Sequence, residues 1–403
     1  MSFNIGKDKL KGEREALRQA ANARGPKDTN TRNAREILAM QAALRTDMDD
    51  EDDEGLELSE VEQMCQQAEE ALQQLEFPTA KSLLEEASKL VQNNEEKAMV
   101  YDLIAQVLLE EGEDVPRAIA VLKEAESLTP NVNYERLVNL GQLTQEQESL
   151  GYYQQGLNVL QEQLNELGPK RKGEDPELTA MRAELLEVAS TVLVSMSELY
   201  VTDLCDEECA ERECERLLQE AVKASATNTE AFRALGNLRM IQGNKAQAAK
   251  YTQHAFKLLV QAAESGKPIP EFLARVDLAK QLLELESWCE ATELFVTLLD
   301  EDENIAEIWY YAGIASINYG RSLGKTDEAY DLQMAAAQYF LQAQKILKQA
   351  PDQEMQDNIE NQLRSLNENG ISVEEAKKAL RTAMTASGEG VDIDDIDSDN
   401  EMN

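Results

Sequence analysis

The sequence predicts an all-α protein built from about seven stacked helix pairs followed by C-terminal capping helices. The 403 residues are 42% hydrophobic but only 5% aromatic. Ala, Leu, Glu and Gln, which favour helices over strands, are abundant. A pattern of large and small residues also recurs along the chain. Because stacked repeats share one continuous core, this recurrence favours a single elongated domain over two or three globular ones.

The clearest copy of the pattern covers residues 229–262. Leu235 and Gly236 are expected on one helix, and Ala248 and Ala255 on the next. A Leu-Gly pair followed by two spaced alanines is typical of the tetratricopeptide repeat, in which two antiparallel helices cross so closely that small residues are required. The predicted fold is therefore a tetratricopeptide (TPR) superhelical solenoid.

The segments that flank the solenoid differ from it in composition. The first segment is basic and is expected to be disordered apart from a possible short helix over 32–45, and it ends in the acidic run 47–54. That run is expected to be a solvated linker or, alternatively, a contact surface for a basic partner. The predicted divisions are 1–54 for this segment, 55–351 for the solenoid, 352–388 for the capping helices and 389–403 for an acidic disordered tail.

Within the solenoid, the first repeat is expected to open with a capping box formed by Ser59 and Glu62. The third repeat has Tyr153 where the pattern calls for alanine, so its packing is expected to be looser. The fourth is irregular, with a long helix over 177–202 and an inserted turn after it. The last contains about eleven extra residues around 320–331, which either extend a helix or form a loop.

The net charge of −39 limits the classes of partner. A chain this acidic attracts polycations and is repelled by phosphates, so direct nucleic-acid binding is not expected. No apolar run is long enough to cross a membrane, and the N-terminus is polar, which argues against a membrane span and a secretory route. Five cysteines fit a reducing compartment. The protein is therefore expected to be soluble and intracellular and to bind basic partners.

The sequence offers no convincing catalytic, metal or cofactor site. Cys205, Cys209 and Cys214 lack the close pairing typical of zinc ligands, and His254 is the single histidine. Acidic neighbours should raise the thiol pKa values, so these cysteines are expected to be structural. No phosphate-binding loop, nucleophile elbow or metalloprotease motif is present. We therefore expect no enzyme activity and no cofactor.

The expected binding surface is the concave face, because the first helix of each pair lines the inside of such a solenoid. Many inner positions are acidic, and tyrosines there could stack on arginine side chains. Any one carboxylate could equally be an ordinary solvated position, but together they predict a groove for a basic, extended segment. The predicted contact residues are Glu62, Glu69, Asp102, Glu110, Glu135, Glu146, Glu198, Tyr200, Asp203, Asp277, Glu284, Glu307 and Tyr310.

One stretch carries a specific resemblance. Residues 197–206 read Ser-Glu-Leu-Tyr-Val-Thr-Asp-Leu-Cys-Asp and are followed by an acidic stretch and Cys-Glu-Arg-Leu-Leu. With the enlarged last repeat and the acidic tail, this resembles the fungal dedicated assembly chaperones of large-subunit ribosomal protein four. The resemblance implies that the groove captures the long basic internal loop of that ribosomal protein. It also implies presence in the cytoplasm and the nucleus, and we expect a monomer.

Three alternatives remain open at this point. Repeats that bind the acidic ends of heat-shock proteins need cations on the inner face, and only Arg233 with Asn237 hints at them. A generic scaffold subunit of a larger complex would need an exposed apolar patch on the convex face. A histone or other basic-protein chaperone would rely on the acidic tail, which deletion of 389–403 would reveal.

Overall fold

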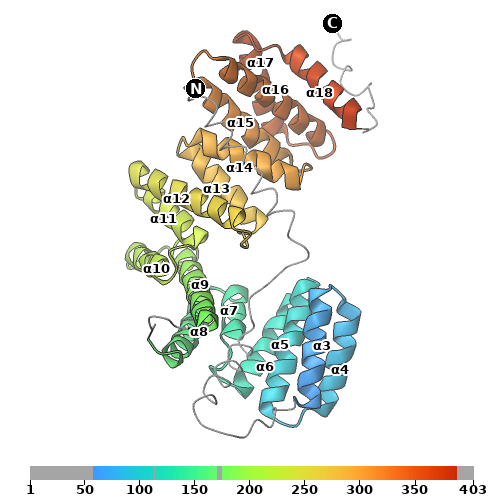
Figure 1. Cartoon of the computed structure of the whole chain (residues 1–403), viewed down its shortest axis with the longest axis vertical. Helices are drawn as coiled ribbons and strands as arrows, with labels where there is room; N and C mark the ends of the chain where they lie inside the picture. The colour runs from blue at the N-terminus through green and yellow to red at the C-terminus, as the bar shows by residue number, and fades with distance from the viewer. Residues whose placement is uncertain (1–57, 113, 170–174, 388–403) are drawn as a thin grey trace. The chain divides into compact units, whose positions relative to one another are not determined.

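The computed structural model describes residues 58–112, 114–169 and 175–387 (Figure 1). Sixteen α-helices and no strand make up this part of the chain, which confirms the all-α fold class. Fourteen of them fit the seven predicted pairs, and two follow as the predicted capping helices. The predicted basic segment with its short helix, the acidic linker 47–54 and the tail 389–403 lie outside the described residues.

The helices belong to two compact units, which we call the N-terminal unit (58–235) and the C-terminal unit (236–387). The division falls inside α11 (Thr229–Ile241). The N-terminal unit contains α3 (Glu60–Gln73), α4 (Phe77–Leu90), α5 (Asn94–Glu110), α6 (Val115–Leu128), α7 (Tyr134–Leu143), α8 (Glu146–Glu166), α9 (Pro176–Leu199) and α10 (Ala210–Ala224). The C-terminal unit contains α12 (Lys245–Glu264), α13 (Phe272–Glu284), α14 (Trp288–Glu301), α15 (Ala306–Ser322), α16 (Asp327–Leu347), α17 (Gln353–Glu368) and α18 (Val373–Ser387).

Consecutive helices pack as hairpins in both units. The N-terminal unit pairs α3 with α4, α5 with α6, α7 with α8 and α9 with α10, and the C-terminal unit pairs α13 with α14 and α15 with α16. The first helices of neighbouring pairs also touch, α3 with α5 and α13 with α15. At the end of the C-terminal unit, α17 and α18 both pack on α16. In the N-terminal unit α3 and α5 therefore lie side by side, and in the C-terminal unit α13 and α15 do, as the repeat pattern requires.

Capping residues fix where several helices begin. The Ser59 hydroxyl accepts a hydrogen bond from the Glu62 amide at 3.2 Å, and the Glu62 carboxylate accepts one from the Ser59 amide at 2.9 Å. This is the capping box that the sequence predicted, and it satisfies two amides that the helix itself leaves unpaired. Side chains of Asn93, Asp114 and Asn244 cap α5, α6 and α12 by accepting one backbone amide each, without the reciprocal bond of a capping box.

Glycines at the helix crossings admit large side chains from the partner helix. A Cβ atom placed on Gly141 of α7 would lie 2.7 Å from the ring of Tyr153 on α8, and one on Gly313 would lie 2.6 Å from the ring of Phe340. Tyr153 is only 4% exposed. The expectation of looser packing in the third repeat is therefore wrong, because the tyrosine ring fills the space that the glycine leaves open.

The two irregular repeats have different structural causes. In the fourth repeat, α9 runs for 24 residues and an irregular turn over 200–209 precedes α10. The last repeat absorbs its extra residues by lengthening both helices, since α15 has 17 residues and α16 has 21. Only residues 323–326 connect them. Gly320 and Ala329, which belong to the extra stretch, are buried, so part of the added length packs inside the C-terminal unit.

Candidate functional site

The predicted contact residues fall on the first helices of the pairs, with three exceptions. Glu146 is the first residue of α8, a second helix, Tyr200 is the C-cap of α9, and Asp203 lies in the turn that follows. The others divide between the units. Glu62 and Glu69 lie on α3, Asp102 and Glu110 on α5, Glu135 on α7 and Glu198 on α9, whereas Asp277 and Glu284 lie on α13 and Glu307 and Tyr310 on α15.

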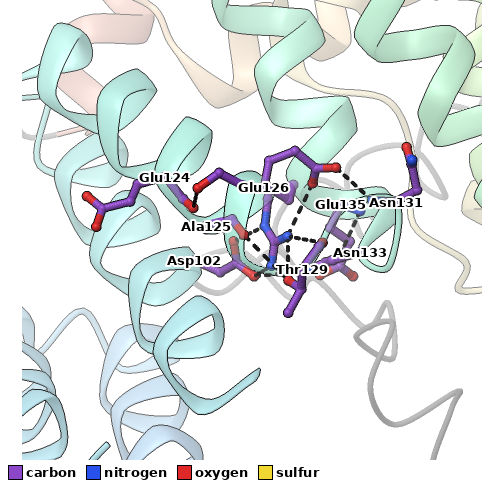
Figure 2. A network of polar contacts seen from close by, with 10 residues as sticks. Asp102, Glu124, Ala125, Glu126, Thr129, Asn131, Asn133 and Glu135 are labelled. Carbon is purple, nitrogen blue, oxygen red and sulfur yellow. Dashed lines mark hydrogen bonds and ion pairs between the residues drawn. The ribbon is translucent and has the colours of Figure 1, made fainter. Parts of the chain in front are cut away.

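Asp102 binds a buried arginine of the next first helix. Arg136 on α7 is 3% exposed, and its Nε and Nη2 donate to the two Asp102 oxygens at 2.7 and 2.8 Å. Its Nη1 donates to Glu126 at 3.2 Å and to both oxygens of Thr129 at 2.9 and 3.0 Å. Asn133 donates to Asp102 at 3.0 Å. Figure 2 shows these partners converging from α5, α6 and the loop before α7.

This network gives Asp102 a structural role. Burial lowers the pKa of Arg136, but hydrogen bonds and charges from Asp102 and Glu126 outweigh the burial and raise it overall. A buried ion that loses its partner typically costs about 3–5 kcal/mol of stability. Asp102 is therefore the counter-ion of a residue that belongs to the fold, and a guest cation would have to compete with Arg136 for it.

Other predicted residues of the N-terminal unit also have partners within the chain. The Glu62 carboxylate belongs to the capping box of α3. Glu110 accepts a hydrogen bond from the side chain of Gln106 at 3.0 Å. Asp203 accepts one from the backbone amide of Glu146 at 3.2 Å, so the structure brings these two predicted residues together. Glu69 and Glu135 are half-buried on α3 and α7.

The end of α9 combines a carboxylate, an aromatic ring and a small hollow. Glu198 lies 3.5 Å from the guanidinium of Arg233, measured from Oε1 to Nη2. Tyr200 lines a cavity of about 240 Å³ together with Met196, Leu217 and Arg216. Burial, assisted by neighbouring Cys209 and acidic side chains, raises the pKa of the Tyr200 hydroxyl. The ring is thus accessible from this hollow while its hydroxyl stays protonated.

In the C-terminal unit, the predicted acids surround a lysine. Asp277 and Glu284 are exposed on α13, and Lys280 lies between them on the same helix. The Lys280 ammonium is 2.9 Å from the Glu307 carboxylate of α15 and lies 5.2 Å from the centre of the Tyr311 ring. These residues bring α13 and α15 together through an ion pair and a cation–π contact.

The predicted aromatic residue on α15 is not the one that holds this cation. The Tyr310 ring packs against Tyr311 at 5.5 Å and against Phe340 at 6.0 Å between ring centres. Tyr310 therefore faces the aromatic core of the unit, and Tyr311 is the ring beneath the cation. The sequence reasoning missed Tyr311 because it assigned stacking to the neighbouring position.

The basic residues of the first helices were also missed. Arg136 and Arg233 in the N-terminal unit and Lys280 in the C-terminal unit each pair with an acid on the preceding or following first helix. In each unit the first helices therefore carry internal acid–base pairs and not carboxylates alone. A basic residue at an inner repeat position could have predicted such an internal ion pair. From the sequence, Arg233 was considered only as a contact for heat-shock partners.

Among the three clustered cysteines, Cys214 shows a raised thiol pKa. Burial raises the pKa of the Cys214 thiol to about 11, with added contributions from Glu215, Glu198 and Glu211. The described residues contain no group of three or more His, Cys, Asp or Glu side chains positioned to hold a metal ion. Among the described helices, none has the length and apolar character needed to cross a bilayer.

Comparison with known proteins supports the predicted resemblance. No protein-family model matches the chain. A Schizosaccharomyces pombe protein described as a probable assembly chaperone of rpl4 is 29% identical over 322 residues, which cover 73% of this chain and 92% of that protein. A protein with the same description from Emericella nidulans is 29% identical over 107 residues, which cover 27% of this chain and 28% of that protein.

The fold also matches a solved structure. The structure of the assembly chaperone of RpL4, Acl4, aligns with a TM-score of 0.58 and 24% identity, covering 65% of this chain and 98% of the solved chain. At this identity the match supports the fold. The chain therefore has the fold of a TPR solenoid. In sequence it is similar, over most of its length, to a fungal protein described as a probable assembly chaperone of rpl4.

Proposed function

We propose that the protein is a dedicated chaperone that escorts large-subunit ribosomal protein four until that protein joins the ribosome. The similarity over 73% of the chain to a probable assembly chaperone of rpl4 carries this proposal. The net charge of −39 supports it independently, since a chain this acidic attracts a cationic guest. A chaperone of this kind needs no catalytic residue and no cofactor, so the protein is not an enzyme.

The guest segment is the long basic internal loop of the ribosomal protein, and the docking surface is the acidic side of the first helices. Without RNA, a basic RNA-binding loop tends to aggregate or to bind the wrong polyanion, and fixed carboxylates substitute for phosphate. Release follows when the denser charge of ribosomal RNA competes for the loop. The protein acts as a monomer in the cytoplasm and the nucleus and does not itself bind nucleic acid.

The exposed acids of the C-terminal unit are the best contact candidates. Asp277 and Glu284 are exposed, and Glu307 is 44% exposed even while it is paired with Lys280. By contrast, Glu62 and Asp102 serve the fold, as a capping residue and as the counter-ion of Arg136. Contact with the guest is therefore proposed to depend more on the α13–α15 side than on Glu62 or Asp102.

Affinity purification of the tagged protein, followed by mass spectrometry, tests the identity of the partner. We expect ribosomal protein four in stoichiometric amount. Its absence, with other basic proteins or a multi-subunit complex in its place, would reject the proposal. Binding that is lost only when residues 389–403 are deleted would instead indicate a general chaperone of basic proteins, acting through the tail.

Charge reversal then tests the surface. The triple variant Asp277→Lys, Glu284→Lys and Glu307→Lys should weaken binding of purified ribosomal protein four by at least tenfold, since it replaces attraction with repulsion at the contact. The matched control reverses three exposed acids on α16 and α17 of the same unit, Asp331, Glu360 and Glu368. Equal weakening by both variants would contradict docking on the first helices.

A further inference from the structure

Lys280 occupies a fully built cation site on the side of the first helices. Its ammonium is 2.9 Å from the Glu307 carboxylate and 5.2 Å from the centre of the Tyr311 ring. Carboxylate and ring come from α15, whereas the lysine comes from α13. An anionic group beside an aromatic face is the arrangement that binds alkylammonium and guanidinium groups. The chain therefore fills this site with a cation of its own.

The site is rigid on the α15 side. The Tyr311 ring stacks with Phe295, their centres 5.8 Å apart and their planes inclined by 17°. Phe295 is fully buried. Tyr310 contacts the same ring at 5.5 Å. Because its aromatic neighbours hold it, Tyr311 stays in place when the cation above it changes.

The lysine, in contrast, can leave at little cost. Lys280 is 35% exposed and Glu307 is 44% exposed, so their pair is solvated and worth little net stability. Asp277 and Glu284 lie three residues before and four residues after it on α13, within reach of a lysine on the same helix face. Lys280 can thus release Glu307 and take a second carboxylate without losing ionic contact.

A guanidinium would use the vacated site better than the ammonium does. It can donate two parallel hydrogen bonds to one carboxylate and stack flat on a tyrosine ring, and it is more weakly hydrated than an ammonium. From these contacts we propose that Lys280 is a displaceable internal occupant of an arginine site. An arginine of the basic guest takes its place between Glu307 and Tyr311, while Lys280 shifts to Glu284 or Asp277. This inference rests on the proposed function for the identity of the guest.

The device would make the chaperone selective for arginine. A guest lysine would make the same contacts with Glu307 and Tyr311 that Lys280 already makes, so replacing Lys280 by it gains little binding free energy. A guest arginine gains the second hydrogen bond and the stacking. Lys280 is therefore proposed as a specificity-determining residue of the docking surface.

A second lysine with similar partners provides a matched control. Lys97 lies 5.1 Å from the centre of the Tyr101 ring and 3.2 Å from Glu124. This cluster joins α5 to α6 within one pair, however, and does not connect two first helices. Replacement of Lys97 by methionine changes the net charge by the same amount as replacement of Lys280, but Lys97 lies outside the α13–α15 side on which contact with the guest is proposed to depend.

The experiment measures binding of two fluorescent peptides of equal length, an Arg-Gly repeat and a Lys-Gly repeat, to the full chain. Wild type should bind the arginine peptide several-fold more tightly. Lys280→Met should tighten binding of the arginine peptide by about three- to tenfold, the value of one cation–π contact with an ion pair. Lys97→Met should leave it within about twofold. Adding Tyr311→Leu to Lys280→Met should abolish the preference for the arginine peptide. The midpoint of thermal unfolding of each variant shows whether the protein is still folded.

Two outcomes would overturn the inference. One is equal tightening by Lys280→Met and Lys97→Met, which would mean that only net charge matters. The other is an unchanged or weakened affinity of Lys280→Met. Purified ribosomal protein four is titrated in parallel. If wild type binds ribosomal protein four but Lys280→Met and Lys97→Met have the same affinity for the arginine peptide, only this inference fails. If wild type does not bind ribosomal protein four but Lys280→Met still binds the arginine peptide more tightly, only the proposed function fails.

Discussion

At the scale of single residues, the fold depends on a few buried charges whose partners are far apart in sequence. Arg136 is 3% exposed and is bound by Asp102, which lies 34 residues earlier in the chain, and by Glu126. The three residues connect α5, α6 and α7. Because the buried guanidinium has all of these partners, the stability of the N-terminal unit should depend on Arg136 more than on an exposed base.

Replacement of Arg136 by methionine should therefore lower the free energy of unfolding by about 3 kcal/mol, the cost of leaving a buried counter-ion unpaired. Urea unfolding followed by circular dichroism measures this change. The control is Arg216→Met, because Arg216 is 48% exposed and pairs with Glu213 and Glu220 on the same helix. Exposed pairs of this kind contribute less than about 1 kcal/mol. If the two variants lost equal free energy of unfolding, the pair of Asp102 and Arg136 would contribute no more to stability than an exposed ion pair does.

Cys214 should behave as a buried, neutral thiol. Its pKa is raised from 9.0 to about 11, chiefly by burial and further by acidic neighbours. A raised pKa in the folded state means that the neutral thiol stabilises the fold. This contribution is fully present below pH 9.0 and is lost as the pH rises through about 11.

Maleimide labelling followed by peptide mass spectrometry checks this expectation. At neutral pH, the exposed Cys205 should react first and Cys214 should remain unmodified until the protein is unfolded by urea. Labelling of Cys214 in the folded protein should accelerate only as the pH approaches 11. Rapid labelling of Cys214 at pH 7 would contradict its burial.

At the scale of helices, close crossings depend on pairing a glycine with a bulky side chain. An added methyl on Gly141 would lie 2.7 Å from the ring of Tyr153, which is too close for either to remain in place. Gly151 on α8, by contrast, has no atom within 4 Å of an added Cβ. The two glycines therefore make a matched pair, one required by packing and one that is not.

Gly141→Ala should destabilise the protein by about 1–3 kcal/mol through overpacking. Gly151→Ala should be neutral or stabilising by up to about 1 kcal/mol, because alanine is the better helix former. Thermal unfolding of both variants measures the difference. Tyr153→Ala alone should also destabilise the protein, because it removes a buried ring. If the ring is the cause, the double variant with Gly141→Ala and Tyr153→Ala should lose less stability than the sum of the two single losses, whereas additive losses would point elsewhere.

The helices themselves could be predicted from sequence, whereas their contacts could not. The capping box of Ser59 and Glu62 and the buried positions Cys214 and Leu218 follow from spacings of three or four residues, which a helix brings to one face. The Tyr153 contact depends on the volume left by Gly141 on another helix. Sequence periodicity does not report such compensation between helices.

The candidate site shows the same limit. The acids on α13 and α15 were predicted from their repeat positions, but the partners of Glu307 were not. Lys280 lies 27 residues before Glu307, and only the packing of α13 on α15 brings the two together. Net charge predicts many carboxylates but does not show which of them already pair with a base of the chain, as Glu307 pairs with Lys280.

At the scale of the whole molecule, the dominant property is charge. Lys and Arg number 39 against 78 Asp and Glu, so with one base for each acid half of the carboxylates have no basic partner on the chain. Their summed field extends about 10 Å into a solution of 0.1 M ionic strength and is screened at higher salt. Such a field accelerates the encounter with a cationic guest without specifying where it docks. Encounter and docking should therefore respond to different sets of residues.

Stopped-flow measurement of binding to ribosomal protein four can separate the encounter from the docking step. Raising the salt from 0.05 to 0.5 M should lower the association rate by about tenfold or more and change the dissociation rate much less. The variant reversed at Asp277, Glu284 and Glu307 and the control reversed at Asp331, Glu360 and Glu368 remove the same charge. Both should slow association to a similar extent, because the long-range field sums over all carboxylates. Only the first should accelerate dissociation, since short-range contacts determine how long the guest stays. If both variants accelerated dissociation equally, the guest would be held by the general field of the molecule, and the side of the first helices would have no special part in binding.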